Sequence, residues 1–105
     1  LDVGPVRGVA EAELGKPVKK SGRTTGLTRG EVTALGATVT VGLGGGVVAR
    51  FSDQVIATPM GQPGDSGSLV LDEANRAVGL LFAGSDQATV CNRIQNVLDA
   101  LGVTF

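Results

Sequence analysis

The chain has 105 residues, a length that fits a single domain, and nine basic and ten acidic side chains give it a net charge of −1. This charge balance, without any run of Lys or Arg, argues against a nucleic-acid partner. No apolar run approaches the roughly 20 residues that a membrane-spanning helix requires, so no membrane association is predicted. Seventeen glycines, only three aromatic residues and many Val and Thr favour short β-strands joined by tight turns.

Cys91 is the only cysteine, so no disulfide can form within the chain. A lone thiol favours a cytoplasmic over a secreted location, because disulfides are rare in reducing compartments. The sequence contains no histidine, which argues against Cys91 as a nucleophile and against a metal site or other cofactor. We expect Cys91 to be a small buried strand residue.

Residues 1–15 show no sustained hydrophobic period and are predicted to be an irregular lead-in or linker, ahead of a domain at 16–105. A short edge strand is predicted at 17–20, because proline is tolerated at the first residue of a strand. Residues 31–41 alternate between apolar and polar side chains, with a change of phase at Leu35 and Gly36 that predicts a turn or bulge.

The glycine-rich segment 42–46 is predicted to be a hairpin connection, since neither Lys-Ser/Thr nor a helix follows it as a phosphate-binding loop would require. Residues 47–58 are predicted to form one long or two short strands. A second hairpin is predicted at 69–83, with its turn at 72–76. Asp53 is predicted to be a solvated loop residue, and so is Asp86.

The chain is predicted to end in a strand near 89–91 and a helix at about 94–101, whose apolar residues recur at helical spacing. Asn92 is a candidate cap for the start of this helix, and Gly102 suits the left-handed residue that follows its end. The fold class predicted is therefore all-β: a six-stranded antiparallel, Greek-key-like barrel with a short C-terminal α-helix.

Residues 64–67 (GDSG) carry the clearest chemical signal. A serine hydroxyl is a poor nucleophile, so acyl transfer needs it exposed on a rigid turn near backbone N–H groups that stabilise the oxyanion. The glycines on either side of Asp65 and Ser66 permit positive φ and close approach of a substrate. The same four residues also suit an ordinary surface turn, so their context decides between the two interpretations.

Two longer motifs supply that context. Residues 61–70 (GQPGDSGSLV) are followed by 77–84 (AVGLLFAG), and residues 20–26 (KSGRTTG) are followed by 30–34 (GEVTA). Together they resemble the chymotrypsin-like (trypsin-like) serine peptidases, most closely the bacterial branch of α-lytic protease and the streptogrisins. The resemblance spans roughly residues 16–101. It implies the C-terminal barrel of a two-barrel fold, with residues 1–15 as an interbarrel linker.

The resemblance implies specific roles in hydrolysis of the peptide bond. Ser66 corresponds to the nucleophile, and the backbone N–H groups of Gly64 and Ser66 correspond to the oxyanion hole. Asp65 resembles the buried carboxylate that pairs with a cation and seats this loop. That cation is an arginine in the bacterial branch, whereas this sequence has Lys20 at the position, with Arg23 as a rival.

The substrate-binding residues implied by the resemblance are those of strand 82–84 and one pocket residue. Phe82, Ala83 and Gly84 correspond to the strand that pairs with the substrate backbone. Met60 corresponds to the base of the primary specificity pocket, where the lack of a carboxylate favours an apolar over a cationic side chain.

Members of this family take their catalytic His and Asp from an N-terminal barrel, which is therefore the expected partner besides a peptide or protein substrate. Without them the isolated chain is expected to be inactive. A Ser-Lys dyad with Lys19 or Lys20 is disfavoured, because the resemblance places both lysines in a structural strand. The alternatives are a barrel that has lost catalysis and binds peptides or another subunit, and a lone barrel that self-associates through its unpaired face.

Overall fold

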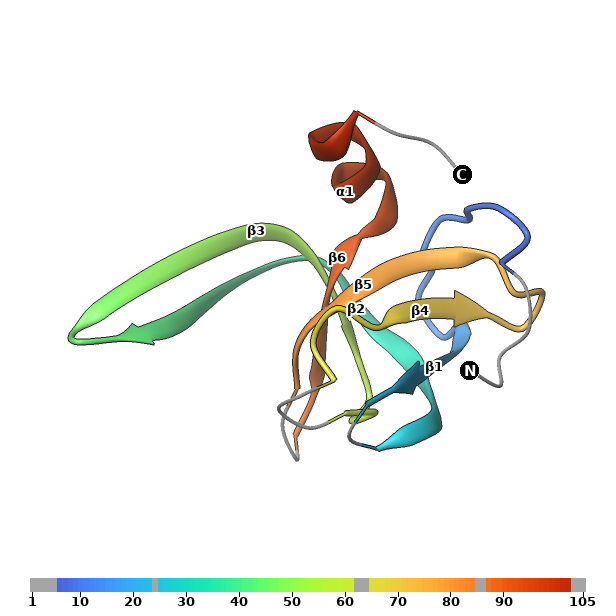
Figure 1. The fold of residues 1–105 in the computed structure, drawn as a ribbon, viewed down its shortest axis with the longest axis horizontal. Helices are drawn as coiled ribbons and strands as arrows, with labels where there is room; N and C mark the ends of the chain where they lie inside the picture. The colour runs from blue at the N-terminus through green and yellow to red at the C-terminus, as the bar shows by residue number, and fades with distance from the viewer. Residues whose placement is uncertain (1–5, 24, 62–64, 85–86, 103–105) are drawn as a thin grey trace.

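The structure, a computed structural model, describes residues 6–23, 25–61, 65–84 and 87–102 (Figure 1). It contains six strands and one helix: β1 (Pro17–Gly22), β2 (Gly26–Gly44), β3 (Val47–Ala57), β4 (Leu69–Asp72), β5 (Ala77–Gly84), β6 (Thr89–Arg93) and α1 (Ile94–Leu101). All pairings between strands are antiparallel, and the strands close a barrel in the order β1-β2-β3-β6-β5-β4. The predicted all-β class, six strands and C-terminal helix are confirmed.

Strand β1 pairs with β2 on one side and with β4 on the other, so the prediction of an edge strand is wrong. Closure of the barrel gives the β1 backbone a hydrogen-bonding partner on both sides. Pro17 is tolerated because it occupies the first position of the strand. Within β1, Val18 and Lys20 are both buried, because residues two apart point to the same face of a strand.

The barrel interior is filled mainly by small and branched apolar side chains from every strand. The buried cluster consists of Ala12, Val18, Val32, Val55, Ala57, Met60, Val70, Val78, Leu81 and Cys91. A second cluster lies where the helix packs on the barrel, and it consists of Leu71, Ala77, Ile94 and Leu98. No helix in the described part of the chain is long and apolar enough to cross a membrane.

Strands β2 and β3 extend beyond the barrel as a long two-stranded hairpin that projects from the molecule in Figure 1. The pairing register shifts between Ala34 and Ala37, and Gly36 has φ of +63°, which confirms the predicted irregularity. A turn at residues 45–46 connects the two strands, which confirms the predicted hairpin, but residues 42–44 of the predicted connection belong to β2.

Residues 6–15 are irregular apart from an isolated bridge, but they are packed onto the barrel. Val9 forms a parallel bridge with Ala77, and the amide of Ala10 donates to the carbonyl oxygen of Ala77 at 2.9 Å. Ala12 is 6% exposed and joins the interior cluster. This segment thus covers one side of β5.

Helix α1 ends at Gly102 in the left-handed conformation, with φ of 69°, as predicted. Its N-cap is Arg93 rather than Asn92, and no side chain caps the first turn. The side chain of Asn92 instead donates to Oε1 of Gln54 on β3, at 2.6 Å. Asp53 also differs from its prediction: it lies in β3 and accepts hydrogen bonds from Arg93 at 2.8 Å and from Asn96 at 3.1 Å.

Candidate active site

Ser66 lies in a tight turn that is fastened to strand β5. The amide of Ser68 donates to the carbonyl oxygen of Asp65 at 3.1 Å, and its hydroxyl donates to the same oxygen at 2.6 Å. Gly67 has φ of +93°, a conformation that favours glycine. Its amide donates to the carbonyl oxygen of Leu81 at 2.7 Å, and the amide of Leu81 donates to Ser68 at 2.8 Å. The turn is therefore held as an extension of the barrel sheet.

The Ser66 side chain is exposed, and its hydroxyl donates to the carbonyl oxygen of Phe82 at 3.1 Å. Among the described residues, the Ser66 amide N–H has no hydrogen-bond partner. Gly64, the other predicted oxyanion-hole residue, lies outside the described residues. An exposed hydroxyl beside an available N–H is the local arrangement that a serine nucleophile requires.

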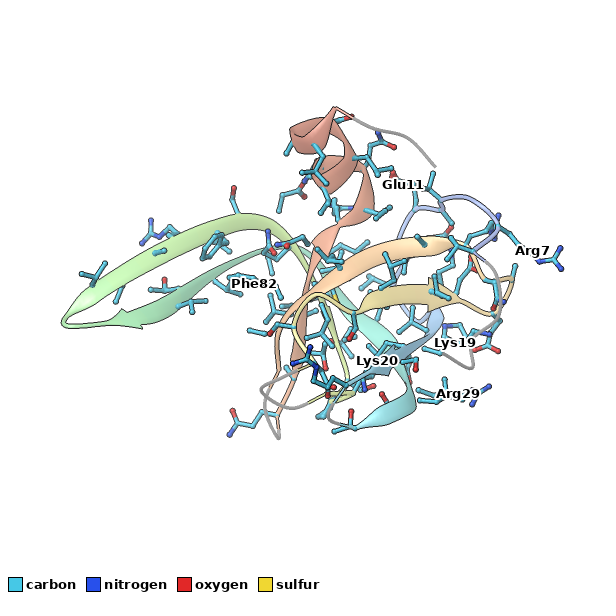
Figure 2. All side chains as sticks on the ribbon, viewed as in Figure 1. Arg7, Glu11, Lys19, Lys20, Arg29 and Phe82 are labelled. Atoms are coloured by element: carbon cyan, nitrogen blue, oxygen red, sulfur yellow. The ribbon has the colours of Figure 1, made fainter. Side chains whose placement is uncertain are left out.

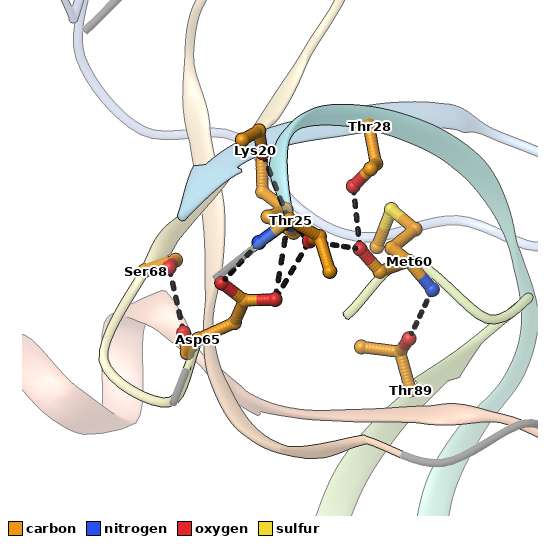
Figure 3. A network of polar contacts seen from close by, with 8 residues as sticks. Lys20, Thr25, Thr28, Met60, Asp65, Ser68 and Thr89 are labelled. Atoms are coloured by element: carbon orange, nitrogen blue, oxygen red, sulfur yellow. Dashed lines mark hydrogen bonds and ion pairs between the residues drawn. The ribbon is translucent and has the colours of Figure 1, made fainter. Parts of the chain in front are cut away.

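Directly before Ser66, the carboxylate of Asp65 is 1% exposed and is held by the connection between β1 and β2 (Figure 3). Thr25 contacts both carboxylate oxygens: its amide donates to Oδ1 at 3.2 Å and its hydroxyl donates to Oδ2 at 2.7 Å. Gly22 passes so close to Asp65 that a β-carbon there would lie 2.4 Å from Oδ1. Exposure of Ser66 and burial of Asp65 are thus two consequences of one turn.

Lys20 supplies the positive charge nearest to Asp65. Its side chain is fully buried, and Nζ lies 3.5 Å from Oδ2 of Asp65. Nζ donates to the carbonyl oxygen of Gly26 at 2.9 Å and also to the hydroxyl of Thr25. The rival cation, Arg23, is exposed in the turn after β1. No hydrogen bond or ion pair among the described residues joins Lys19 or Lys20 to Ser66.

Lys19 points away from this network. It lies directly opposite Arg29 in the pairing of β1 with β2, and the two cations lie near each other on the molecule in Figure 2. Alternation along β1 therefore separates the two lysines, because Lys20 enters the barrel and Lys19 stays on its outer face.

The backbone of Met60 is held between two threonines. The hydroxyl of Thr28 donates to its carbonyl oxygen at 2.5 Å, and its amide donates to the hydroxyl of Thr89 at 2.8 Å. The Met60 side chain is 3% exposed and belongs to the interior cluster. A β-carbon on Gly30 would lie 2.8 Å from Cγ of Met60, so this side chain is closely confined.

The predicted substrate strand, residues 82–84, is the last part of β5. On one edge Ala83 and Gly84 pair with β6, whereas on the other edge the pairing with β4 ends at Leu80. The ring of Phe82 lies edge-on to the ring of Phe51, with centroids 4.5 Å apart, and Figure 2 places Phe82 near the base of the projecting hairpin. Among the described residues, no strand pairs with β5 on the β4 side beyond Leu80, and the Phe82 carbonyl oxygen there accepts from the Ser66 hydroxyl.

A cavity of about 420 Å³ opens on the hairpin side of β5. Residues from β2, β5, β6 and the segment before β6 line it: Val39, Thr40, Val41, Gly42, Ala83, Ala88 and Val90. Within the described ranges, no three His, Cys, Asp or Glu side chains come together as a metal site would require. The described residues at the site supply hydroxyl, backbone amide, carboxylate and ammonium groups.

Thr25 and Gly22, which both contact the Asp65 carboxylate, are among the site residues that the sequence analysis missed. Both lie within the 20–26 motif, so the resemblance pointed to the segment but not to their contacts. The signal that could have identified Thr25 is the replacement of the family's arginine by Lys20. A lysine lacks the planar fork that binds a carboxylate with two N–H groups, so an additional donor is needed.

No protein-family model matches the sequence. Serine protease 2 of Streptomyces fradiae is 41% identical over 80 residues, which cover 76% of this chain and 43% of that protein. Streptogrisin-A of Streptomyces griseus is 37% identical over 98 residues, which cover 89% of this chain and 31% of that protein. The chain thus spans less than half of the length of these curated relatives.

The comparison with solved structures agrees with the comparison of sequences. A chymotrypsin of Cellulomonas bogoriensis superposes with a TM-score of 0.83 and 31% identity, over 95% of this chain and 54% of that one. The α-lytic protease homologue N4 superposes with a TM-score of 0.72 and 26% identity, over 99% of this chain and 57% of that one. The chain therefore belongs to the chymotrypsin-like serine peptidases, in the bacterial branch of the streptogrisins, and forms a C-terminal barrel of that fold.

Proposed function

We propose that this barrel is the C-terminal half of a serine endopeptidase and that Ser66 is its nucleophile. The observation that carries the proposal is the pairing of an exposed Ser66 hydroxyl with a fully buried Asp65 in one turn. A buried, hydrogen-bonded neighbour fixes the backbone of the turn, so the hydroxyl and the Ser66 N–H keep a defined geometry. Such preorganisation is what oxyanion stabilisation requires.

In this reaction the Ser66 oxygen forms a bond to the substrate carbonyl carbon, and the C–N bond then breaks to leave an acyl-enzyme. The N–H groups of Ser66 and Gly64 stabilise the oxyanion between these events. The serine proton must pass to a base and then to the leaving amine. The Ser66 hydroxyl must therefore give up its hydrogen bond to Phe82 when the base is in place.

The base is proposed to come from a partner barrel. This chain has no histidine, and the hydrogen bonds of the Lys20 amine are made to Thr25 and Gly26. A partner barrel with His and Asp would complete the triad. Alone, the 105 residues retain at most the residual catalysis that binding and an oxyanion hole provide.

The edge of β5 with which no described strand pairs suits a peptide substrate that adds as an antiparallel strand at Phe82, Ala83 and Gly84. Main-chain hydrogen bonds to this edge would align the peptide with Ser66, because the Ser66 hydroxyl already lies 3.1 Å from the Phe82 carbonyl oxygen. Met60, which corresponds to the base of the specificity pocket, carries no carboxylate, and its side chain is buried in the barrel interior. This favours apolar over cationic residues at the cleaved bond.

The test is to co-express this chain with the proposed partner barrel and to treat the complex with a fluorophosphonate. Ser66 is expected to become labelled, and Ser66→Ala is expected to abolish both labelling and peptidase activity. Ser52→Ala is the matched control, because Ser52 is another exposed serine, on β3. An intact complex in which Ser66 stays unlabelled contradicts the catalytic proposal.

A second candidate function is peptide binding without catalysis. The observation that favours it is the cavity beside Ala83, whose lining within the described residues does not include Ser66. In that case Ser66→Ala would leave the affinity for peptides unchanged, and no turnover would occur at any concentration of the complex.

We also consider self-association of the isolated chain through its exposed apolar side chains. Several large apolar side chains are more than a third exposed: Val9, Leu14, Leu27, Leu35, Val47, Val48 and Leu101. Light scattering on the isolated chain measures this directly, and a monomer at all concentrations would argue against it.

A further inference from the structure

We propose that Thr25 is a positioning residue that relays the charge of Lys20 to Asp65 and thereby holds the turn that presents Ser66. This inference rests on the proposed function, because its purpose is to keep the nucleophile in place. The basis is geometric: one threonine contacts both oxygens of the Asp65 carboxylate and also accepts a hydrogen bond from the Lys20 amine (Figure 3).

The direction of each hydrogen bond follows from the groups involved. An ammonium group can only donate, so the Thr25 oxygen must accept from Lys20. The carboxylate of Asp65 can only accept, so the single hydroxyl proton of Thr25 must go to it. The Met60 carbonyl oxygen competes for this proton, but it lies 3.5 Å from the hydroxyl whereas Oδ2 of Asp65 lies 2.7 Å away.

Lys20 does not replace this contact by itself. Its Nζ lies 3.5 Å from Oδ2 of Asp65, which is within ion-pair range but beyond a normal N–H···O hydrogen bond. A second donor bond fixes Nζ on the carbonyl oxygen of Gly26, at the start of β2. The Thr25 hydroxyl therefore completes a buried chain of hydrogen bonds from Lys20 to Asp65. The Lys20 ammonium group does not complete that chain by itself.

Asp65 also fixes the backbone of the turn that contains Ser66. Its carbonyl oxygen accepts from both the amide and the hydroxyl of Ser68, so rotation of the Asp65 backbone would break both bonds. Loss of the Thr25 hydroxyl would remove the hydrogen bond of 2.7 Å that it donates to Oδ2 of Asp65. We expect the carboxylate and its backbone to shift, and the Ser66 hydroxyl and N–H to lose their alignment.

The experiment compares variants of the complete two-barrel protein. Thr25→Val removes the hydroxyl at nearly constant shape and keeps the hydrogen bond from the backbone amide to Oδ1 of Asp65. It is expected to slow fluorophosphonate labelling of Ser66 by about 10- to 100-fold. This effect is smaller than the ~10²–10³ loss of rate that follows removal of an oxyanion-hole donor. Thr25→Ser restores the hydroxyl and is expected to stay within about threefold of wild type. Thr33→Val is the matched control, because the exposed Thr33 hydroxyl bonds only the Ile56 carbonyl, at 3.3 Å.

The Lys20→Arg background tests the relay itself. A guanidinium can donate two N–H groups to one carboxylate, so it reduces the need for the hydroxyl. In that background Thr25→Val is expected to cost less than about fivefold. An equal cost in both backgrounds, or equal rates for Thr25→Val and Thr25→Ser, overturns the relay.

A measurement without catalysis separates this inference from the proposed function. In Thr25→Val, amide hydrogen exchange at Gly67 and Ser68 is expected to accelerate at least tenfold, with Thr25→Ser and Thr33→Val unchanged. Unchanged exchange in Thr25→Val overturns the relay. If wild-type Ser66 is never labelled, the proposed function fails, and the exchange result alone still decides whether Thr25 holds the turn.

Discussion

Gly22 and Asp65 are in contact with no space between them: a β-carbon on Gly22 would lie 2.4 Å from Oδ1 of Asp65 and 2.8 Å from its Cγ. The hydroxyl of Ser68 would lie 2.9 Å from the same β-carbon. The carboxylate next to Ser66 is therefore seated against bare backbone, and the absence of a side chain at position 22 is part of the candidate site.

The change Gly22→Ala should therefore disturb both stability and the Ser66 turn. Because an added β-carbon would meet the confined side chain of Asp65, we expect a loss of about 1–3 kcal/mol in the free energy of unfolding and slower labelling of Ser66. Chemical denaturation and fluorophosphonate kinetics measure the two effects. Gly42→Ala is the control, since a β-carbon there meets nothing within 4 Å. Similar behaviour of the two variants would show that the contact is unimportant.

Breaking the buried ion pair from either side should be costly. Lys20 and Asp65 are both fully buried, so Lys20→Met leaves a carboxylate without its cation, and Asp65→Leu leaves an ammonium without its anion. Each single variant is expected to lose about 3–5 kcal/mol of unfolding free energy. The double variant should lose less than the sum of the two, because neither charge is then left alone. Additive losses in a denaturation series would contradict this coupling.

The sequence allowed much of the fold to be predicted because turns and the helix depend on local chemistry. Glycines near position 45 set one hairpin, polar residues at 72–76 set another, and Gly102 ends the helix. Lys20 was identified only through the resemblance, and the structure places it on the same face of β1 as Val18, in the interior of the barrel.

Local sequence patterns do not indicate which distant residue a polar side chain contacts. Asn92 looked like a helix cap, but its amide is used by Gln54 on a neighbouring strand. Asp53 looked like a solvated loop residue, but Arg93, 40 positions later, pairs with it. Thr25 escaped notice for the same reason, because its partner Asp65 is also 40 positions away.

The pH dependence of stability should involve Asp72, the last residue of β4 before the turn to β5. Burial by itself raises the pKa of Asp72, but the amides of Arg76 and Ala74, and the charges of Arg76 and Lys16, outweigh burial and hold the pKa below its ordinary value. A lowered pKa in the folded state means that the carboxylate contributes stability above the unfolded pKa of about 3.9. That contribution is lost as the pH falls through the folded pKa.

Asp72→Asn is therefore expected to destabilise the protein by about 1–3 kcal/mol at pH 7, and the difference from wild type should shrink as the pH falls below about 4. Denaturation at a series of pH values measures both. Glu73→Gln removes one exposed charge from the same turn and should change stability by less than about 0.5 kcal/mol. If the loss of stability caused by Asp72→Asn grew on acidification, the stabilising role of the Asp72 carboxylate would be contradicted.

Cys91 should be unreactive as long as the barrel is folded. It is 1% exposed, and burial raises its pKa to about 12. At pH 8 the population of thiolate, the reactive form, is then about a thousandfold smaller than for an ordinary thiol, and access is blocked as well. We expect an aromatic disulfide reagent to modify Cys91 at least a hundredfold faster in denaturant than in buffer. Ser52→Cys in the Cys91→Ala background is the control, because it places the thiol on the exposed part of β3, where it should react at once. Rapid modification of native Cys91 would mean that the barrel opens far more often than its packing implies.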